Sequence, residues 1–405
     1  MRHPPAHIFE FTPESLKAWC AQRGLAPFRA AQILEWVYQK GVADPARMSN
    51  LSKRDRDLIA DPTNGLTFLS GQTVSHQCAT DGTQKLLIQW DEVPPASSPL
   101  TPRHLDTSTP SQNGVSLAIL PSTPRHVDTS TPPDPSRQTE CVMIPADDRN
   151  TACISSQVGC PVGCKFCASG IGGLDGNLSA GRIVEQVWRL RSLLSPPDAI
   201  LSPTAPRITN VVFMGMGEPL SNFAAVTAAI RTLNAPWGMN ISARKITIST
   251  VGLPKAIERL ASEFDLPVTL ALSLHAPNDD VRRELIPWAE YTTIPELLAA
   301  CQKWFEKTGR EITLEYILLG GVNDRPEHAR QLADIARTIR ANINLIRYNE
   351  VKGMPFARPT DEAVRTFQQI LRDKGVNTHI RASRGRDIAA ACGQLRHEKN
   401  NVAAA

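Results

Sequence analysis

The spacing of hydrophobic residues predicts three short helices near the start of the chain. Thr12 supplies a helix cap before Pro13, and Gly24 predicts the end of that first helix. A second helix over 27–40 and a third over 52–60 follow. The second helix places four hydrophobic residues on one face, namely Phe28, Ala31, Leu34 and Val37. The pattern indicates a small helical accessory domain over residues 1–65.

Residues 66–91 show the pattern of a β-hairpin extension. The runs 73–78 and 85–90 are rich in strand-forming residues, and the Asp81-Gly82 pair between them is a strong turn signal. We therefore expect two antiparallel strands between the helical domain and the rest of the chain.

From residue 139 onward, short apolar runs alternate with amphipathic segments. The expected strands are 140–145, 152–155, 208–214, 245–250, 268–274, 311–318, 342–347 and 377–382. The expected helices are 180–194, 223–233, 254–263, 294–308, 326–340 and 361–374. This alternation predicts an α/β domain over 139–393, built as a partial (β/α) barrel of about six units, with a flexible tail over 394–405.

Residues 92–138 differ from both neighbouring segments. About half of them are Pro, Ser or Thr, and the decapeptide TPRHLDTSTP at 101–110 recurs as TPRHVDTSTP at 123–132. Such a composition does not supply a packed core. We expect a disordered insertion in a surface loop, and two copies are too few for a repeat fold.

Composition narrows the class of protein. The 405 residues contain no apolar run long enough to span a membrane, and the first residues lack the apolar core of a signal peptide. Nine scattered cysteines do not form a disulfide framework, so we expect a cytoplasmic protein with reduced thiols. A net charge of +4 is compatible with RNA binding without requiring it.

Three cysteines lie close together in the segment 153–167, which reads CISSQVGCPVGCKFC. Cys160, Cys164 and Cys167 have the spacing C-x3-C-x2-C. A structural zinc site and an iron–sulfur cluster both normally take four protein ligands, so three thiolates leave one position open. Buried thiols that serve only packing, and a zinc site completed by a distant residue, are the alternatives to an iron–sulfur cluster.

Polar residues follow several of the expected strands at their carboxyl ends. Gly217 and Glu218 follow one strand, Ser249 the next, Ser273 and His275 another, and Asn349 a later one. Each alone is compatible with a turn or a strand cap. Ligands in parallel α/β folds gather at the carboxyl ends of strands, so we expect these residues to share a site.

These motifs together resemble a known family. The C-x3-C-x2-C spacing with Phe166 before the last cysteine resembles the cluster loop of radical S-adenosylmethionine (SAM) enzymes. The wider sequence resembles the RlmN/Cfr family of adenine methyltransferases, which act on 23S rRNA and tRNA. The stretches that carry this resemblance are FRAAQILEWVYQKG, SSQVGCPVGCKFCASG, VVFMGMGEPLSN, ITISTVGL, LALSLHAPNDDVRRELIP, LEYILLGGVNDRPEHA and HIRASRGRDIAAACGQL.

The resemblance implies roles for individual residues. Cys160, Cys164 and Cys167 would bind one [4Fe–4S] cluster. Seven residues would bind SAM, namely Gly217, Glu218, Ser249, Ser273, Leu274, His275 and Asn349. Cys392 would carry a methyl group, Cys153 would form a disulfide with it, and Glu140 would stand at the family's proton-acceptor position.

The resemblance also implies the reaction. The enzyme would methylate carbon 2 of adenosine 2503 in 23S rRNA and of adenosine 37 in tRNA through S-methylcysteine, with two SAM molecules per turnover. A flavodoxin- or ferredoxin-type protein would reduce the cluster of a monomeric enzyme. Two alternatives remain open, which are methylation at carbon 8 of the same rRNA adenosine and a metal-containing RNA-binding protein without catalysis. Arg381, Arg384 and Arg386 lie near Cys392 and would contact RNA phosphates or form a solvated basic cluster.

Overall fold

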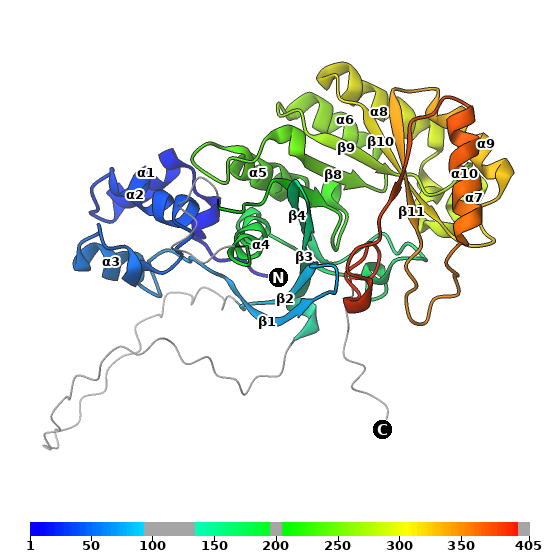
Figure 1. Ribbon diagram of the computed structural model, residues 1–405. Helices are drawn as coiled ribbons and strands as arrows, with labels where there is room; N and C mark the ends of the chain where they lie inside the picture. The colour runs from blue at the N-terminus through cyan, green and yellow to red at the C-terminus, as the bar shows by residue number, and fades with distance from the viewer. Residues whose placement is uncertain (93–133, 195–204, 396–405) are drawn as a thin grey trace, which may run out of the picture.

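The computed structural model describes residues 1–92, 134–194 and 205–395. Its centre is a ten-stranded sheet with the order β1-β2-β3-β4-β7-β8-β9-β10-β11-β12 (Figure 1). The predicted insertion lies mostly outside the described residues, which resume at Asp134, and so does most of the expected tail.

The first four strands of this sheet form an antiparallel meander. They are β1 (Gly71–Cys78), β2 (Gln84–Trp90), β3 (Gln138–Ala146) and β4 (Arg149–Cys153). Gly82 adopts a φ of 80° in the turn between β1 and β2, as the Asp-Gly pair predicts. The hairpin pairs with β3, so it extends the edge of the main sheet.

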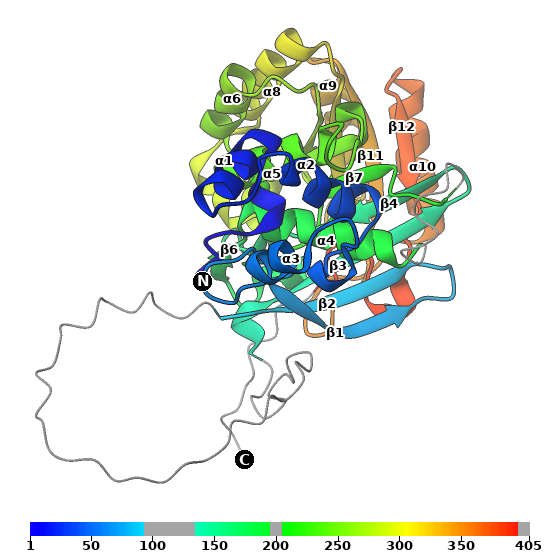
Figure 2. The same cartoon turned by 90° about the vertical axis from the view of Figure 1, so that its left-hand side faces the viewer.

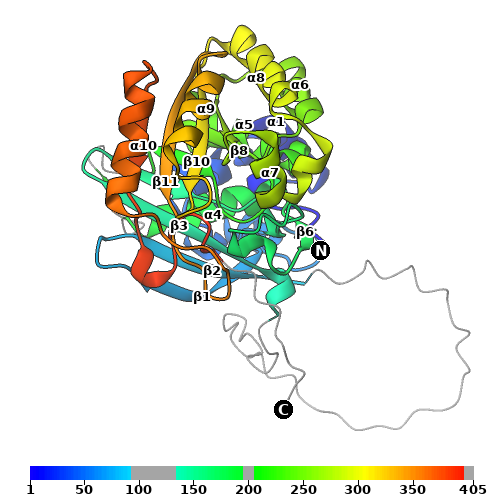
Figure 3. The same cartoon turned by 90° about the vertical axis from the view of Figure 1, so that its right-hand side faces the viewer.

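A parallel half-barrel begins at β4. Its further strands are β7 (Asn210–Phe213), β8 (Ile246–Thr250), β9 (Thr269–Ser273), β10 (Ile312–Leu318), β11 (Ala341–Arg347) and β12 (Thr378–Arg381). The helices after these strands lie along its outer side (Figures 1 and 3). They are α4 (Ala180–Ser192), α5 (Phe223–Asn234), α6 (Pro254–Glu263), α7 (Asp279–Leu285), α8 (Ile294–Thr308), α9 (Pro326–Ala336) and α10 (Asp361–Asp373). Among the described residues, six β/α units precede β12, which confirms the predicted partial barrel.

The local sequence explains the burial of β10 and the two ends of α8. All seven residues of β10 are buried, as expected for a strand in the middle of a sheet covered on both faces. Thr293 and Glu296 form a reciprocal capping box at the start of α8, and Gly309 ends that helix with a φ of 65°. The bounds of α8 therefore follow from its own capping residues.

The N-terminal domain is helical, as predicted. It contains α1 (Pro13–Gln22), α2 (Arg29–Leu34) and α3 (Lys53–Ile59), with short turns at Ile8–Glu10, Glu35–Gln39 and Pro45–Arg47. These helices lie in front of α4 and α5 in Figure 2. Trp188 of α4 donates its indole N–H to the backbone oxygen of Val37 at 2.9 Å, which joins the domain to the barrel.

Several local predictions are wrong or incomplete. Residues 35–39 form a π-helical turn, and Phe28 is exposed, so the predicted apolar face is incorrect. Strand β4 begins at Arg149 and ends at Cys153, so it lies earlier than the strand expected over 152–155. The sequence reasoning also missed α7 and a two-stranded sheet that flanks the cysteine loop, made of β5 (Gln157–Gly159) and β6 (Leu174–Asn177).

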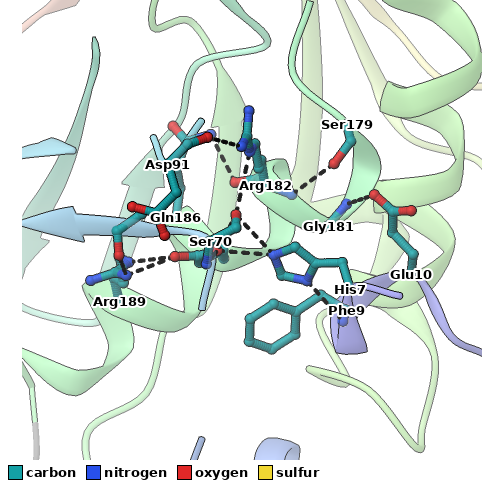
Figure 4. Close-up of polar contacts among 12 residues, drawn as sticks. His7, Phe9, Glu10, Ser70, Asp91, Ser179, Gly181, Arg182, Gln186 and Arg189 are labelled. Carbon is teal, nitrogen blue, oxygen red and sulfur yellow. Dashed lines mark hydrogen bonds and ion pairs between the residues drawn. The ribbon is translucent and has the colours of Figure 1, made fainter. Parts of the chain in front are cut away.

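A buried polar network holds the N-terminal segment, the hairpin and α4 together (Figure 4). One oxygen of Glu185 accepts hydrogen bonds from the Ser70 N–H at 2.8 Å, the Ser70 hydroxyl at 2.9 Å and the His7 ring at 3.0 Å. The other oxygen accepts from Arg189 at 2.7 Å. Burial alone would raise the pKa of Glu185, but these hydrogen bonds and the Arg189 charge hold it below its usual range.

The Ser70, His7 and Glu185 side chains resemble a hydrolytic triad only in composition. The Nδ1 atom of His7 accepts a hydrogen bond from the Phe9 N–H, so the ring proton is on Nε2, which faces both Ser70 and Glu185. His7 therefore has no free nitrogen to take the Ser70 proton. All three side chains are buried, and the network serves structure.

None of the helices in the three described ranges is both long and apolar enough to cross a membrane.

Candidate active site

The cysteine loop lies at the inner face of the half-barrel, between β5 and β6. Gly159 and Gly163 take φ values of 75° and 69°, which let the backbone wrap tightly on either side of Cys160. The Cys160 N–H donates to the Gly173 oxygen at 2.9 Å, and the Cys167 N–H donates to the Cys164 oxygen at 3.1 Å. Cys160, Cys164 and Cys167 consequently line one cavity.

Burial is the largest influence on the pKa values of these three thiols. It raises the pKa of Cys160 to about 12, and it raises the pKa values of Cys164 and Cys167 as well. The charges of Cys160 and Cys167 raise the pKa of Cys164 further, so the three sulfurs influence one another. Thiols in such a setting ionise when a bound cation compensates them.

Among the described residues, no three His, Cys, Asp or Glu side chains are arranged so that they could bind a single metal ion. The three cysteines share the wall of a cavity that also has polar strand-end residues. Three thiols on one loop beside such a cavity fit an iron–sulfur cluster that keeps one iron available to a ligand.

Most of the predicted ligand-binding residues line this same cavity, which we call the inner cavity. They are Gly217, Glu218, Ser249, Ser273 and His275. They come from the ends of β7, β8 and β9, which are neighbours in the sheet. The expectation that successive strand ends form one site is therefore correct for these five residues.

Glu218 is held firmly by backbone donors. Its two carboxylate oxygens accept hydrogen bonds from the Leu220 N–H at 3.0 Å and the Val251 N–H at 2.8 Å. Burial raises the pKa of Glu218 to about 7, against the lowering effect of these donors. The carboxylate thus has a fixed direction at the cavity wall.

The glycines of the GMGEP motif are required by the protein's own packing. A Cβ atom on Gly217 would lie 2.7 Å from atoms of Ser156 and Gln157, and one on Gly215 would lie 2.7 Å from the Ile154 backbone. Gly217 also has a φ of 105°. These contacts favour the tight turn over close approach of a ligand as the reason for glycine.

His275 occupies a constrained position at the end of β9. Its φ is 58°, and its Nδ1 atom accepts the Ile317 N–H at 3.1 Å, so Nε2 carries the ring proton. Burial, with a smaller contribution from the Arg282 charge, lowers the pKa of His275 to about 3. The ring is therefore neutral and packs edge-on against Phe166 at 5.1 Å between centroids.

Leu274 and Asn349 lie elsewhere. Leu274 is fully buried and is not among the residues that line the inner cavity, although its N–H donates to the Glu315 oxygen at 3.1 Å. Asn349 lines a second cavity and donates its amide to the Cys392 oxygen at 3.4 Å. We call this second space the outer cavity.

Cys392 lies where the two cavities meet. It lines both of them, and among the predicted site residues it alone does so. Burial raises the pKa of its thiol, and the neighbouring Arg381 guanidinium opposes that rise. Cys153 is buried in the adjacent apolar cluster, and its pKa is raised to about 12 by burial and by the nearby Cys392.

Glu140 is separated from this junction. Its carboxylate forms an ion pair with Lys85 at 2.7 Å, and both side chains are about 10% exposed. It lines a third cavity with residues of the C-terminal loop, including Arg386 and Ala389. Of the three expected catalytic residues, Cys392 alone lines the inner and outer cavities. Cys153 lies near enough for the Cys392 charge to raise its pKa, and Glu140 lines the third cavity.

The three arginines near Cys392 do not form one surface. Arg381 is partly buried and donates to the Met214 sulfur at 3.1 Å. Arg381 and Arg384 both line the outer cavity, where Arg384 is exposed, and Arg386 lines the third cavity. A common position beside Cys392 therefore holds for Arg381 and Arg384, and contact of these residues with RNA phosphates stays a prediction.

Two charged residues of the inner site escaped the sequence reasoning. Arg282 is fully buried and donates to the backbone oxygens of Leu274 and Val251. Glu315 lines the inner cavity from the middle of β10. For Glu315, the signal in the sequence was a charged residue inside the otherwise apolar strand β10. Such groups are rarely buried without a partner.

Comparison with known proteins agrees with this geometry. The chain matches a model of the ribosomal RNA large subunit methyltransferase N-terminal domain over residues 6–62 and the radical SAM superfamily over 154–333. A radical SAM methyltransferase from Sphaerobacter thermophilus has a similar structure, with a TM-score of 0.80 and 37% identity over 97% of this chain and 100% of that one.

Curated relatives match nearly the whole chain. A probable dual-specificity RNA methyltransferase RlmN from Symbiobacterium thermophilum is 41% identical, covering 95% of this chain and 89% of the relative. One from Rhodopirellula baltica is 36% identical, covering 98% and 92%. The half-barrel with its three-cysteine loop defines a radical SAM enzyme. More specifically, the chain belongs to the RlmN family of dual-specificity RNA methyltransferases.

Proposed function

We propose that this enzyme methylates carbon 2 of an adenosine in 23S rRNA, at position 2503, and in tRNA, at position 37, through S-methylcysteine at Cys392. The main support for this proposal is the position of Cys392 between the two cavities. A residue that takes a methyl group from one ligand and delivers it to another must reach both, and Cys392 lines the inner and the outer cavity.

The inner cavity suits the cofactors of this chemistry. Cys160, Cys164 and Cys167 would hold one [4Fe–4S] cluster and leave one iron open for SAM. Glu218, Ser249, Ser273 and His275 would fix SAM beside it, with Gly217, Leu274 and Asn349 shaping the surrounding backbone. When bound, the cluster and two SAM molecules per turnover supply a methyl group and a 5′-deoxyadenosyl radical.

The two further cysteines have successive roles in this scheme. The Cys392 thiolate would accept the first methyl group by displacement. The 5′-deoxyadenosyl radical would remove one hydrogen atom from that S-methyl group, and the carbon would then bond to the adenine ring, which gives its ring proton to a base and one electron back to the cluster. The Cys153 thiolate would attack the Cys392 sulfur and break the sulfur–carbon bond; the carbon takes up a proton to become the methyl group, the RNA is released, and a disulfide joins the two cysteines. The charge of Cys392 raises the pKa of the Cys153 thiol, which places Cys153 in the neighbourhood of Cys392 and supports this pairing.

The proton on the adenine ring needs an acceptor, and Glu140 and Cys153 are the candidates. Glu140 is paired with Lys85 at 2.7 Å in a neighbouring cavity, whereas Cys153 is buried where the charge of Cys392 raises its pKa. Both groups remain candidates for this step.

The outer cavity suits an extruded nucleotide. Its lining includes Arg149, Arg384, Asn210 and Asn349 around Cys392, and its volume is about 320 Å³. Enzymes that modify a base take it out of the stack into such a pocket, and exposed arginines at the rim contact phosphates. We infer that a flavodoxin- or ferredoxin-type protein reduces the monomeric enzyme in the cytoplasm, where the cluster thiols stay reduced.

Nucleoside mass spectrometry tests the reaction and its substrates. Reconstituted enzyme is incubated without oxygen with SAM, a reductant and either unmodified 23S rRNA fragments or tRNA. We expect 2-methyladenosine from both RNAs. A Cys392→Ala variant with the same iron content is the control, and it should give no methylated nucleoside.

Other products would change the assignment. 8-Methyladenosine would show carbon 8 as the target, which the same residues permit. Cleavage of SAM to 5′-deoxyadenosine without any methylated nucleoside would retain the radical chemistry and overturn the RNA substrate.

A further inference from the structure

A buried carboxylate oxygen of Glu315 faces the inner cavity without a hydrogen-bond donor. Glu315 is 2% exposed and lies in the middle of β10. Its Oε1 atom accepts the Asn344 amide at 3.0 Å, whereas its Oε2 atom is buried and has no hydrogen-bond partner among the described residues. An unsatisfied buried carboxylate oxygen is costly, so its retention indicates a missing donor.

Glu315 cannot turn away from the cavity easily. Its backbone oxygen accepts the N–H groups of Leu274 and His275 at 3.1 and 3.2 Å. Register pairs Glu315 with Ser273 on β9 and with Asn344 on β11. The side chain is therefore fixed by both neighbouring strands.

Glu315 completes a row of oxygen atoms across three strands. The Ser249 and Ser273 hydroxyls, on the neighbouring strands β8 and β9, are 3.2 Å apart, although Ser249 pairs in register with Ala271. Glu315 on β10 is the register partner of Ser273. All three residues line the inner cavity. A row of two hydroxyls and a carboxylate suits a ligand that carries neighbouring hydroxyl groups.

Glu218, the other carboxylate in this cavity, is already engaged. Both of its oxygens accept backbone N–H groups, at 2.8 and 3.0 Å. The ammonium group of SAM would bind beside the open iron and Glu218. The Arg381 guanidinium acts on Glu315 through its charge but donates to the Met214 sulfur and leaves Oε2 without a hydrogen bond. The ribose hydroxyls of SAM would supply that donor.

We propose that Glu315 binds the ribose of SAM by accepting a hydrogen bond from a ribose hydroxyl at Oε2. The inference rests on the proposed use of SAM and extends it to a residue outside the predicted set. It makes Glu315 a determinant of specificity for a ribonucleoside over a deoxyribonucleoside.

Calorimetric binding of S-adenosylhomocysteine and its 2′-deoxy and 3′-deoxy analogues to the cluster-loaded protein tests this role. The wild-type protein should bind one deoxy analogue about 10- to 100-fold more weakly, as expected for a lost hydrogen bond to a charged group. Glu315→Gln should weaken S-adenosylhomocysteine binding by a similar factor, and the same deoxy analogue should then bind with no further loss.

Glu311→Gln provides a matched control. Glu311 accepts the Asn342 amide at 2.9 Å, which repeats the Glu315–Asn344 contact, but it does not line the inner cavity. This variant should bind all three ligands as the wild type does. Iron content and thermal unfolding establish that each variant is folded and loaded.

Two outcomes would overturn the inference. Equal affinity of the wild-type protein for all three ligands would do so without reference to any variant, and so would a Glu315→Gln variant that keeps the wild-type discrimination. A loaded wild-type protein that does not bind S-adenosylhomocysteine at all would instead contradict the proposed function, so the two failures are distinguishable.

Discussion

The reactivity of Cys392 depends on two opposing influences. Burial raises the pKa of its thiol, whereas the Arg381 guanidinium favours the thiolate. Arg381 is held in place by its contact with the Met214 sulfur at 3.1 Å. A thiolate is the form that accepts a methyl group, so Arg381 should promote the first step of the reaction.

Arg381→Met should therefore slow methylation of Cys392 in the absence of RNA. We expect about a tenfold or larger decrease, because an interaction of about 1.4 kcal/mol changes the thiolate fraction tenfold. Mass spectrometry of the protein during a single turnover measures the rate. Arg384→Met is the control, because Arg384 is exposed in the outer cavity, and its rate should be unchanged. Equal rates for both variants would contradict the role of Arg381.

Cys153 should act after the bond to RNA has formed. Cys153→Ala should still methylate Cys392 but should accumulate a covalent complex with RNA, because no thiol remains to attack the Cys392 sulfur. Denaturing gel electrophoresis with labelled RNA detects the complex. Cys301→Ala is a suitable control, since Cys301 is buried in the main core and away from the site. Free methylated RNA from the Cys153 variant would argue against the disulfide step.

Sequence alone predicted the cysteine loop because its signal is local. Cys160, Cys164 and Cys167 lie within one short loop, so their spacing already limits how the sulfurs can be arranged. Glu315 could not be found in this way. Its significance depends on the register that places it between Ser273 and Asn344, and that register follows from strand pairing across distant parts of the chain.

At the scale of elements, the β1–β2 hairpin forms hydrogen bonds with the loop that leads to Cys392. The Gly385 N–H donates to Asp81 at 3.0 Å, and the Thr80 N–H donates to Asp387 at 2.9 Å. Lys85 adds a contact to the Ala389 oxygen at 3.3 Å. The hairpin thus serves the active site although it is far from Cys392 in sequence.

Lys85 also neutralises Glu140, which gives a prediction for stability. Lys85→Met should lower the free energy of unfolding by about 3–5 kcal/mol, because it removes the ammonium group that lies 2.7 Å from a largely buried carboxylate. Lys85→Met combined with Glu140→Met should recover most of that loss, since no uncompensated charge remains. Denaturant unfolding of the two single variants and the double variant measures the coupling. Additive losses would show that the pair contributes no specific interaction.

The elements themselves were predictable where periodicity was strong. The strand over 311–318 and the helix over 294–308 match β10 and α8 closely, because a continuous apolar run and a capping box define them. The apolar face of the second helix was wrong because Phe28 and Ala31 are exposed, whereas Ala30 and Ile33 are buried beside Leu34. The predicted hairpin was correct as an element. Its hydrogen bonds to the C-terminal loop could not be predicted, because they join residues that are far apart in the sequence.

At the scale of the whole molecule, Glu185 links the helical domain to the barrel. It receives hydrogen bonds from His7 and Ser70 and pairs with Arg189, so three segments meet at one carboxylate. Glu185→Gln should reduce the free energy of unfolding at pH 7 by about 3–5 kcal/mol, because it leaves the buried guanidinium of Arg189 without its charge partner.

The same carboxylate gives the interface a dependence on pH with a definite sign. The pKa of Glu185 in the folded protein lies below its ordinary value of 4.5. Its ionised form therefore stabilises the folded state fully above about pH 4.5, and this contribution is lost as the pH falls through the lowered pKa. The stability difference between wild type and Glu185→Gln should accordingly be largest near pH 7 and should shrink below pH 4.5. Thermal unfolding of both proteins across this range measures the difference, with Glu263→Gln as an exposed control. A difference that stays constant with pH would mean that Glu185 acts through packing, and that its charge does not hold the helical domain against the barrel.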